Sequence, residues 1–390
     1  MIPLSVPSLR GNELRYLAEC IESEWVSSAG PFVSRFERDI ARYCGSEYAV
    51  ACISGTAALH VALLLCGIRP DEEVIVPTLT FIAPVNAVRY VGADPVFMDC
   101  DDHLNLDPEK LEAFLTEECE TTAYGLRNRR TGRRVSAILI VHVFGHLANM
   151  SAIAAISRHY RLPLVEDATE ALGSFHVAPD GTRRHAGTIG DVGCLSFNGN
   201  KILTTGGGGM ILTAGQRLAE RARYLTTQAK DDPDRFVHHE IGFNYRLTNV
   251  AGAIGCAQLE RLDEFVERKR AHAAAYREQL AGVSGLRLID EPSYSCSNYW
   301  FDTLVIDSRA YGSTAEQLMK TLAAREIEAR MIWDLVHRQR PYQASQSYRI
   351  ERAIRYQEQC LNLPCSVSLP SRTIAEICDV IGAANPCGAS

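Results

Sequence analysis

The residue whose type and surroundings point most directly to chemistry is Lys201. Lysine and arginine together number 40, and the chain has only these lysines: Lys110, Lys201, Lys230, Lys269 and Lys320. Unlike arginine, lysine can lose its proton and form a Schiff base with an aldehyde. Lys201 follows residues 196–200, which read Ser-Phe-Asn-Gly-Asn, and precedes glycines 206–209. This setting favours a lysine that carries pyridoxal phosphate (PLP). Taken alone, however, a lysine of this kind is more often an ordinary surface residue in a loop, and the other motifs of the chain are needed to reverse that interpretation.

A second candidate, Asp167, ends an apolar stretch. Residues 162–167 read Leu-Pro-Leu-Val-Glu-Asp, which predicts a short buried parallel strand that ends in carboxylates. Functional residues of open α/β sheets gather at the carboxyl ends of strands. PLP needs an acidic partner for its pyridinium nitrogen, because a protonated ring is a better electron sink. Asp167 is placed for that role, and a helix N-cap is the alternative interpretation.

A third feature is a set of small polar residues at the start of an apolar helix pattern. Ser54, Gly55 and Thr56 precede apolar residues that continue through Leu65, and Gly67 is a stop signal. Free backbone N–H groups at such a helix start bind anions, although the residues also suit a plain N-cap. Neither a Walker-type phosphate loop nor a nicotinamide-binding glycine motif is present, so those nucleotide sites are not expected.

Taken together, these features resemble the DegT/DnrJ/StrS-type sugar-nucleotide aminotransferases, which are PLP enzymes of fold type I. The resemblance runs nearly end to end, and the order and spacing of its motifs are more specific than any one motif. The motifs are residues 25–33, 36–37, 54–59, 76–81, 141–146, 166–168, 196–201, 206–209 and 242–248. The resemblance therefore implies an α/β fold with a large domain, built on a mostly parallel sheet flanked by helices, and a smaller C-terminal α/β domain.

The resemblance also assigns roles around the cofactor. Lys201 would form the Schiff base and then act as general acid–base for the proton shift. Asp167 would hold the pyridinium nitrogen. The N–H groups of Gly55 and Thr56, with the hydroxyl group of Ser196, would hold the phosphate.

Three further residues have cofactor roles by resemblance. Phe81 matches an aromatic residue that stacks on the cofactor ring, with core packing as the alternative. Glu170 stands where many relatives have Gln or His near the phenolic oxygen of PLP. A carboxylate there repels a phenolate unless one of the two is protonated, so the role of Glu170 stays open. Asn244 matches an asparagine that reaches the cofactor phosphate from the partner subunit, which implies a homodimer with shared active sites.

The substrate-facing candidates are less specific. Trp25 suits contact with a sugar or base, and packing is equally compatible. His337 lies where many relatives have a Pro-Leu-His segment whose histidine approaches the sugar nucleotide, but this chain lacks the proline. His142 and His146 flank the end of an expected strand, where they could line the site or serve as structural histidines.

Composition agrees with a large enzyme. The chain has 390 residues, a formal net charge of −7 and 13 cysteines. The acidic balance gives no electrostatic basis for binding nucleic acid, and the local cluster of arginines at residues 127–134 is interpreted as a solvated loop. Scattered cysteines without a Cys-x-x-Cys pair indicate reduced thiols and no metal site, hence a cytoplasmic location. No signal segment or membrane-spanning run is expected.

Short apolar stretches alternate with helical patterns along the chain. Strands are predicted at residues 74–76, 95–98, 135–141, 162–166, 193–197, 210–213 and 301–306. Asp107 and Pro108 predict the start of a helix that covers residues 110–116. A long helical pattern over residues 247–280 leads to a further helix at 314–324. We therefore expect a large PLP-binding domain at residues 1–250 and a small domain at 251–390.

The leading functional hypothesis is transfer of an amino group from L-glutamate to a ketone of a nucleotide-linked deoxysugar. Likeness to the legionaminic acid and bacillosamine branch favours UDP-2-acetamido-2,6-dideoxy-4-ketohexose as the acceptor. One alternative is a PLP-dependent sugar dehydratase, whose relatives replace the Schiff-base lysine with histidine. The other is a non-catalytic regulator that kept the fold. Lys201 argues against the dehydratase, and Lys201 with Asp167 argues against the regulator.

Overall fold

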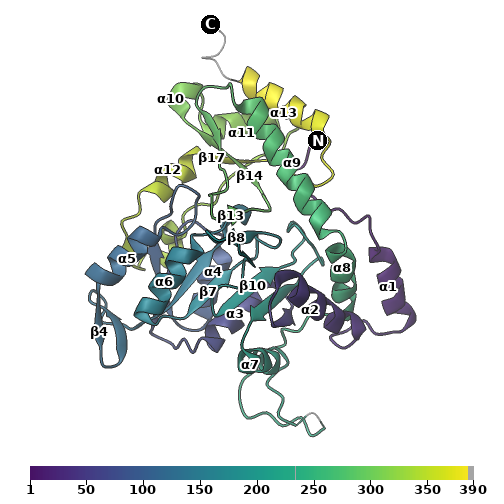
Figure 1. Ribbon diagram of the computed structural model, residues 1–390, viewed down its shortest axis with the longest axis vertical. Coiled ribbons are helices and arrows are strands. Elements are labelled where there is room, and N and C mark those ends of the chain that lie inside the picture. Colours follow the sequence, from purple (N-terminus) through teal and green to yellow (C-terminus); the bar gives the residue numbers. More distant parts are fainter. Residues whose placement is uncertain (233, 385–390) are drawn as a thin grey trace.

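An eight-stranded sheet forms the centre of the computed structural model, which describes residues 1–232 and 234–384 (Figure 1). All of its strands run parallel except β11, which is antiparallel to both of its neighbours. In spatial order the strands are β1 (Tyr48–Cys52), β11 (Gly209–Thr213), β10 (Val192–Ser196), β7 (Leu164–Asp167), β6 (Val135–Val141), β2 (Glu73–Pro77), β3 (Asp94–Met98) and β16 (Ser347–Tyr348).

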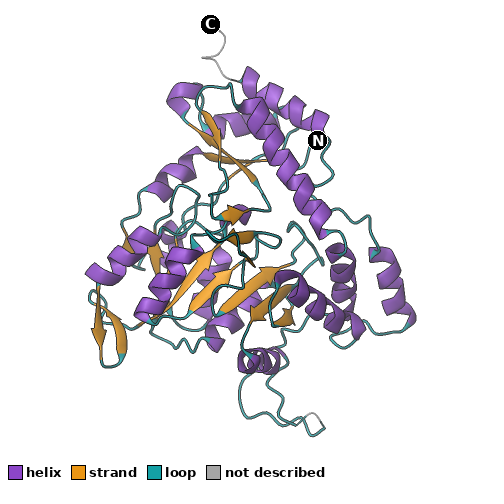
Figure 2. Cartoon of the chain, in the orientation of Figure 1, coloured by secondary structure: helices purple, strands orange, loops and turns teal. Residues whose placement is uncertain are grey.

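Helices cover both faces of this sheet (Figure 2). Successive side chains of β6 divide between two apolar clusters, with Leu139 on the side of α3 and α4 and Ile138 on the side of α5 and α6. This division explains why every residue of β6 is buried, as expected for a parallel strand covered on both faces. The helices before the C-terminal part are α1 (Glu13–Glu22), α2 (Pro31–Cys44), α3 (Gly55–Leu65), α4 (Ile82–Tyr90), α5 (Pro108–Glu117), α6 (Met150–Tyr160), α7 (Gln216–Thr226) and α8 (Asn249–Leu259), with the 3-10 turn η1 (Val143–Gly145).

The C-terminal part has its own antiparallel sheet and apolar cluster. Its strands, in spatial order, are β12 (Leu286–Leu288), β14 (Asp302–Ile306), β17 (Cys360–Leu363) and β15 (Arg330–Met331). Its helices are α9 (Leu262–Leu280), α10 (Ser308–Tyr311), α11 (Ala315–Ala323), α12 (Arg352–Gln359) and α13 (Ser371–Ala383), with the 3-10 turns η2 (Val336–Arg338) and η3 (Arg340–Tyr342). Side chains of α9, β14, α11, β17 and α13 form one core. The chain also returns to the large sheet, because β16 pairs with β3.

The expected fold class, an α/β fold with a large, mostly parallel sheet flanked by helices and a smaller C-terminal part, is confirmed by this architecture. Asp107 caps α5 as predicted, since its carboxylate accepts from the N–H groups of Glu109 and Lys110. The long helix predicted over residues 247–280 is instead two helices, α8 and α9, separated at residues 260–261. The division into residues 1–250 and 251–390 stays a prediction.

The sequence did not predict β1, β12, β15, β16 and β17, nor several short strands outside the two larger sheets. The latter are β4 (Cys119–Thr122) and β5 (Gly125–Asn128), which form a hairpin, and β8 (Phe175–Val177), β9 (Arg183–His185) and β13 (Ser295–Cys296), which form a small sheet. The hairpin carries part of the arginine cluster, and Glu120 pairs with both Arg127 and Arg129. These ion pairs neutralise part of the local positive charge. Within residues 1–232 and 234–384, no helix has both the length and the apolar character needed to cross a bilayer.

Candidate active site

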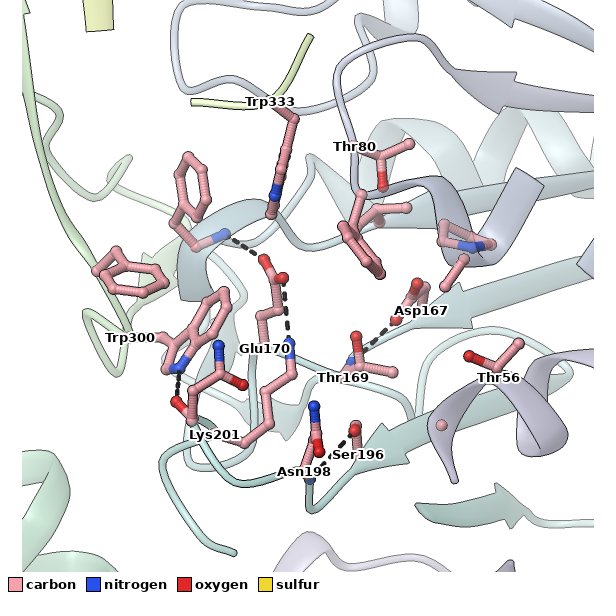
Figure 3. Close-up of a pocket in the computed structure, with 18 of the residues that line it drawn as sticks. Thr56, Thr80, Asp167, Thr169, Glu170, Ser196, Asn198, Lys201, Trp300 and Trp333 are labelled. Carbon is pink, nitrogen blue, oxygen red and sulfur yellow. Dashed lines mark hydrogen bonds and ion pairs between the residues drawn. The ribbon is translucent and has the colours of Figure 1, made fainter. Parts of the chain in front are cut away.

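A cavity of about 340 Å³ lies at the carboxyl ends of the parallel strands and is also lined by residues from the C-terminal part. The structure brings together most of the cofactor residues named from the sequence. Those that line the cavity are Gly55, Thr56, Phe81, Asp167, Glu170, Ser196 and Lys201. Figure 3 shows that Lys201, Glu170 and Asp167 lie on neighbouring loops and strand ends.

One end of the cavity is the start of α3. Ser54 caps this helix, and its Oγ accepts a hydrogen bond from the N–H of Ala57 at 3.0 Å. The first N–H groups of a helix have no partner within it, so those of Gly55 and Thr56 are oriented to bind an anion. A Cβ atom on Gly55 would lie 2.8 Å from the Cβ of Ser196. Glycine therefore lets the helix start approach the Ser196 hydroxyl, and the three residues suit a phosphate group.

Asp167 is the last residue of β7 and is buried. Its Oδ1 accepts a hydrogen bond from the N–H of Thr169 at 3.0 Å. Burial raises the pKa of Asp167 above its usual value, although the hydrogen bonds of Thr169 and the positive charge of Lys201 act against this shift. A cation bound beside Asp167 would stabilise its ionised form. A protonated ring nitrogen is such a cation, so the position fits the role expected from the sequence.

Glu170 and Lys201 form an ion pair, with 3.2 Å between Oε1 and Nζ. The other oxygen of Glu170 accepts from the N–H of Phe144 at 2.9 Å, which fixes the carboxylate (Figure 3). Burial raises the pKa of Glu170, while Lys201 and the Phe144 N–H act in the opposite direction. Glu170 is therefore a direct partner of the amine, a contact that the sequence did not indicate.

The hydroxyl group of Thr80 indicates that the cavity binds a polar ligand. It is buried, lines the cavity and has no hydrogen-bond partner within the described chain. A buried hydroxyl without a partner costs free energy, and a bound polar molecule would remove that cost. Together with the helix start, the carboxylate of Asp167 and the amine of Lys201, this donor set fits PLP.

The residue before Asp167 has a structural role. Glu166 is fully buried, and its carboxylate accepts hydrogen bonds from the N–H groups of Gly187 at 2.8 Å and Ile189 at 2.6 Å. His142 also contacts it, with 3.0 Å between Nε2 and Oε2. Since His142 Nδ1 accepts from the N–H of Ala148, its Nε2 carries the proton and donates to Glu166. His142 therefore anchors the strand end and does not line the cavity.

Other candidates lie outside the cavity lining. His146 is buried and contacts the hydroxyl of Ser297, and burial lowers the pKa of His146 to about 4. The His337 Nδ1 lies 2.6 Å from the Oγ1 of Thr78. Trp25 and Asn244 are exposed. None of these four candidates lines the cavity of its own chain.

The sequence did not identify the cavity residues of the C-terminal part. These residues are Trp300, Phe301, Arg330, Met331, Trp333 and Asn362. Trp300 immediately precedes a predicted strand, and no local pattern distinguishes it from a core residue. Its contact with Lys201 is a long-range contact, so no spacing rule could have found it.

The family model of the DegT/DnrJ/EryC1/StrS aminotransferases matches residues 7–382. The chain belongs to this family. It is therefore a PLP-dependent aminotransferase, and the enzyme class and cofactor expected from the sequence are confirmed.

Individual DegT/DnrJ/EryC1/StrS relatives align over most of the chain. A GDP-perosamine synthase of Caulobacter vibrioides is 38% identical over 390 residues, covering 98% of this chain and 97% of the relative. The putative pyridoxal phosphate-dependent aminotransferase EpsN of Bacillus subtilis is 37% identical, covering 87% and 83%. The solved structure of the aminotransferase TlmJ from Streptoalloteichus hindustanus superposes with a TM-score of 0.87 at 30% identity, covering 98% of each chain.

The contacts of Glu166 predict a stability effect of Glu166→Gln. Burial acts to raise the pKa of Glu166, but the hydrogen bonds from His142 and the backbone outweigh it and hold the pKa below its usual value. The amide would place a donor against donors, so we expect the free energy of unfolding at neutral pH to fall by about 2–4 kcal/mol. Urea denaturation followed by circular dichroism would measure this loss.

The pH dependence gives the control for this prediction. A carboxylate with a depressed folded-state pKa stabilises the fold above its unfolded pKa, and this stability is lost as pH falls through the folded pKa. The difference between wild type and Glu166→Gln should therefore shrink below about pH 4. Glu316→Gln, at an exposed Glu–Lys pair, should leave the free energy of unfolding almost unchanged, because water screens such pairs. Equal losses in both variants would contradict the role of Glu166.

Proposed function

We propose that this aminotransferase transfers the amino group of L-glutamate to the ketone of a nucleotide-linked keto-deoxysugar, giving an amino sugar nucleotide for surface glycan biosynthesis. The observation that carries the proposal is the single cavity in which Lys201, Asp167 and the start of α3 meet. The alignment with a GDP-perosamine synthase over 98% of the chain supports the substrate class.

The side chains around the cavity have distinct tasks in this proposal. Bound PLP would supply the electron sink. The N–H groups of Gly55 and Thr56 and the Ser196 hydroxyl bind its phosphate, and Asp167 keeps a proton on its ring nitrogen. Lys201 would hold the cofactor covalently, and its ε-amino group would move a proton when free. Phe81, which lines the cavity, packs on one face of the bound ring.

Two acceptors have support. The branch likeness in the sequence favours UDP-2-acetamido-2,6-dideoxy-4-ketohexose. The name of the Caulobacter relative specifies a GDP-linked sugar, and that relative aligns with almost the whole chain. We therefore place a GDP-linked keto-deoxysugar first and the UDP-linked sugar second. Trp25 and His337 are proposed to contact the acceptor.

We also propose an isologous homodimer with shared active sites. Asn244 is exposed and does not line the cavity of its own chain, which supports a role in the site of a partner. Large apolar side chains are exposed elsewhere on the chain, including Leu14, Ile21, Trp25, Ile53 and Ile241. Exposed apolar groups of this kind suit an interface between copies. The cytoplasmic location expected from the cysteines stays a prediction.

The first test is Lys201→Ala. Loss of the lysine that lines the cavity should abolish borohydride-trapped cofactor and lower turnover by roughly 10³-fold or more. Lys201→Arg should fail as well, because a guanidinium stays protonated. Lys320→Ala, which removes an exposed lysine of α11, should behave like wild type. A trapped peptide that contains another lysine would refute the assignment, and PLP binding without turnover on any amino donor would favour the regulator hypothesis.

The second test concerns the acceptor. Purified protein is incubated with L-glutamate and GDP-, UDP- and dTDP-linked 4-keto-6-deoxy sugars, and products are identified by mass spectrometry. We expect conversion of ketone to amine to be fastest with the GDP-linked sugar. Faster conversion of the UDP-linked N-acetylated sugar would reverse the order of the two acceptors. Activity restricted to simple keto acids would contradict the proposed function.

The third test concerns Asn244. A hydrogen bond from its amide to a charged phosphate contributes about 1.5–3 kcal/mol, so Asn244→Ala should weaken PLP binding by roughly 10- to 100-fold. Two differently tagged chains are then co-expressed, one with Asn244→Ala and one with Lys201→Ala. If Asn244 serves the partner's site, the chain that keeps Lys201 receives an intact Asn244, so the mixed dimer has one site of wild-type affinity.

The converse dimer provides the control for the third test. One chain carries both substitutions and its partner is wild type, so the only site with a lysine receives alanine from the doubly substituted chain. Its PLP affinity should match that of the Asn244→Ala homodimer. Wild-type affinity in this second dimer, or full activity of a monomer at high dilution, would exclude shared sites.

A further inference from the structure

The ε-amino group of Lys201 lies between an aromatic ring and a carboxylate. Its Nζ atom is 3.9 Å from the centroid of the Trp300 ring and 3.2 Å from Oε1 of Glu170 (Figure 3). Glu170 follows β7 of the large sheet, whereas Trp300 precedes β14 of the C-terminal part. Two distant parts of the chain therefore meet at this nitrogen.

Trp300 is held in place by hydrogen bonds on three sides. Its indole Nε1 donates to the carbonyl oxygen of Asn200 at 2.8 Å, and its backbone N–H donates to Oδ1 of Asn298 at 2.8 Å. Its carbonyl oxygen accepts from Nζ of the buried Lys269 at 2.8 Å. Only 3% of Trp300 is exposed. Because Asn200 precedes Lys201 in the chain, the indole is tied to the same turn that carries the amine.

Both partners of the amine attract a cation. The face of an indole ring attracts a cation, most strongly where water is excluded, and the carboxylate forms a charge-assisted hydrogen bond. The other charged groups that line the cavity are Asp167 and Arg330. The negative charge of Asp167 acts in the same direction as the ring and Glu170, and the positive charge of Arg330 acts against them.

We propose that Trp300 and Glu170 form a binding site for the free ε-ammonium group of Lys201, and that this site stabilises the enzyme form in which Lys201 has no covalent bond to the cofactor. The inference rests on the role proposed above for Lys201. It makes Trp300 a positioning residue, since it acts on the amine and through Asn200 on the turn that carries it.

Such a site would affect the first half of the proposed reaction, in which the cofactor receives the amino group of glutamate. Glutamate gives its amino group to the cofactor, the bond between Lys201 and the cofactor is broken, and one water supplies the oxygen of 2-oxoglutarate. Lys201 is then a free amine that takes up a proton. A site that binds this ammonium favours the amino form of the cofactor, which is the form that reacts with the keto sugar.

The first experiment uses protein freed of PLP. Competitive labelling with acetic anhydride across a pH range is read by mass spectrometry of the Lys201 peptide, with exposed Lys320 as the reference in the same digest. Trp300→Leu removes the aromatic face, so the pH midpoint for labelling Lys201 should move down by about one unit. Trp300→Phe keeps a ring but loses the bond to Asn200, and should move it by less.

Matched variants separate the ring from other effects. Phe301→Leu removes a neighbouring aromatic side chain that packs on Trp300 but keeps the ring over the amine, and should move the midpoint by less than Trp300→Leu does. Glu170→Gln keeps the size of the side chain, loses the charge and should lower the midpoint. An unchanged midpoint in Trp300→Leu would overturn the proposal, and so would equal shifts in Trp300→Leu and Trp300→Phe. If Trp300→Leu does not fold, the proposal is tested by Trp300→Phe and Glu170→Gln, each of which should lower the pH midpoint for labelling Lys201.

The second experiment uses the PLP-loaded protein. Absorption spectra at fixed ratios of glutamate to 2-oxoglutarate give the equilibrium between the two cofactor forms. Trp300→Leu should shift it roughly tenfold toward the form linked to Lys201, the equivalent of one pH unit; no shift would refute the proposal. Borohydride trapping in the same samples tests the role of Lys201 independently, so trapping on another lysine would reject the proposed function itself.

Discussion

Alternation of side chains along β7 is the constraint from which the rest of the site follows. Glu166 and Asp167 are adjacent, so their side chains point to opposite faces of the sheet. Glu166 therefore meets backbone N–H groups of residues 187–190 and His142, and Asp167 meets the cavity. One carboxylate has its charge satisfied by the protein. The other is buried with a raised pKa and is left for a ligand to satisfy.

The amine is controlled from outside the large sheet. Lys201 follows β10, but Trp300, whose ring lies over the Lys201 nitrogen, precedes β14. The backbone carbonyl oxygen of Trp300 accepts a hydrogen bond from Lys269, which belongs to α9. The Trp300 indole thus connects the C-terminal part to the ε-amino group of Lys201. A change in the packing of α9 against the start of β14 would alter the environment of the amine without touching the cavity.

Local sequence signals predicted local features. β6 was predicted to the residue, and Ser54 and Asp107 cap helices as their positions indicate. Residues 260–261, where α8 and α9 separate, include no glycine or proline. The helical pattern therefore predicted one continuous helix there. The resemblance of motifs predicted that Lys201, Asp167 and Glu170 belong to one site, because each motif lies at or near the end of a strand of the same sheet. All three residues line the cavity. The resemblance could not place Trp300, whose contact depends on how two sheets pack.

The two-residue strand β16 has a consequence for the chain beyond the site. It pairs with β3 at one margin of the large sheet, where unpaired backbone N–H and C=O groups would otherwise invite another strand to add. Because β16 is so short, it offers little of its own backbone for further pairing. The segment between β15 and α12 therefore covers the β3 edge of the large sheet, and a covered edge disfavours edge-to-edge aggregation. Loss of the pairing between β16 and β3 would leave this edge of the large sheet open to another strand, with the cavity side chains of the large sheet unchanged.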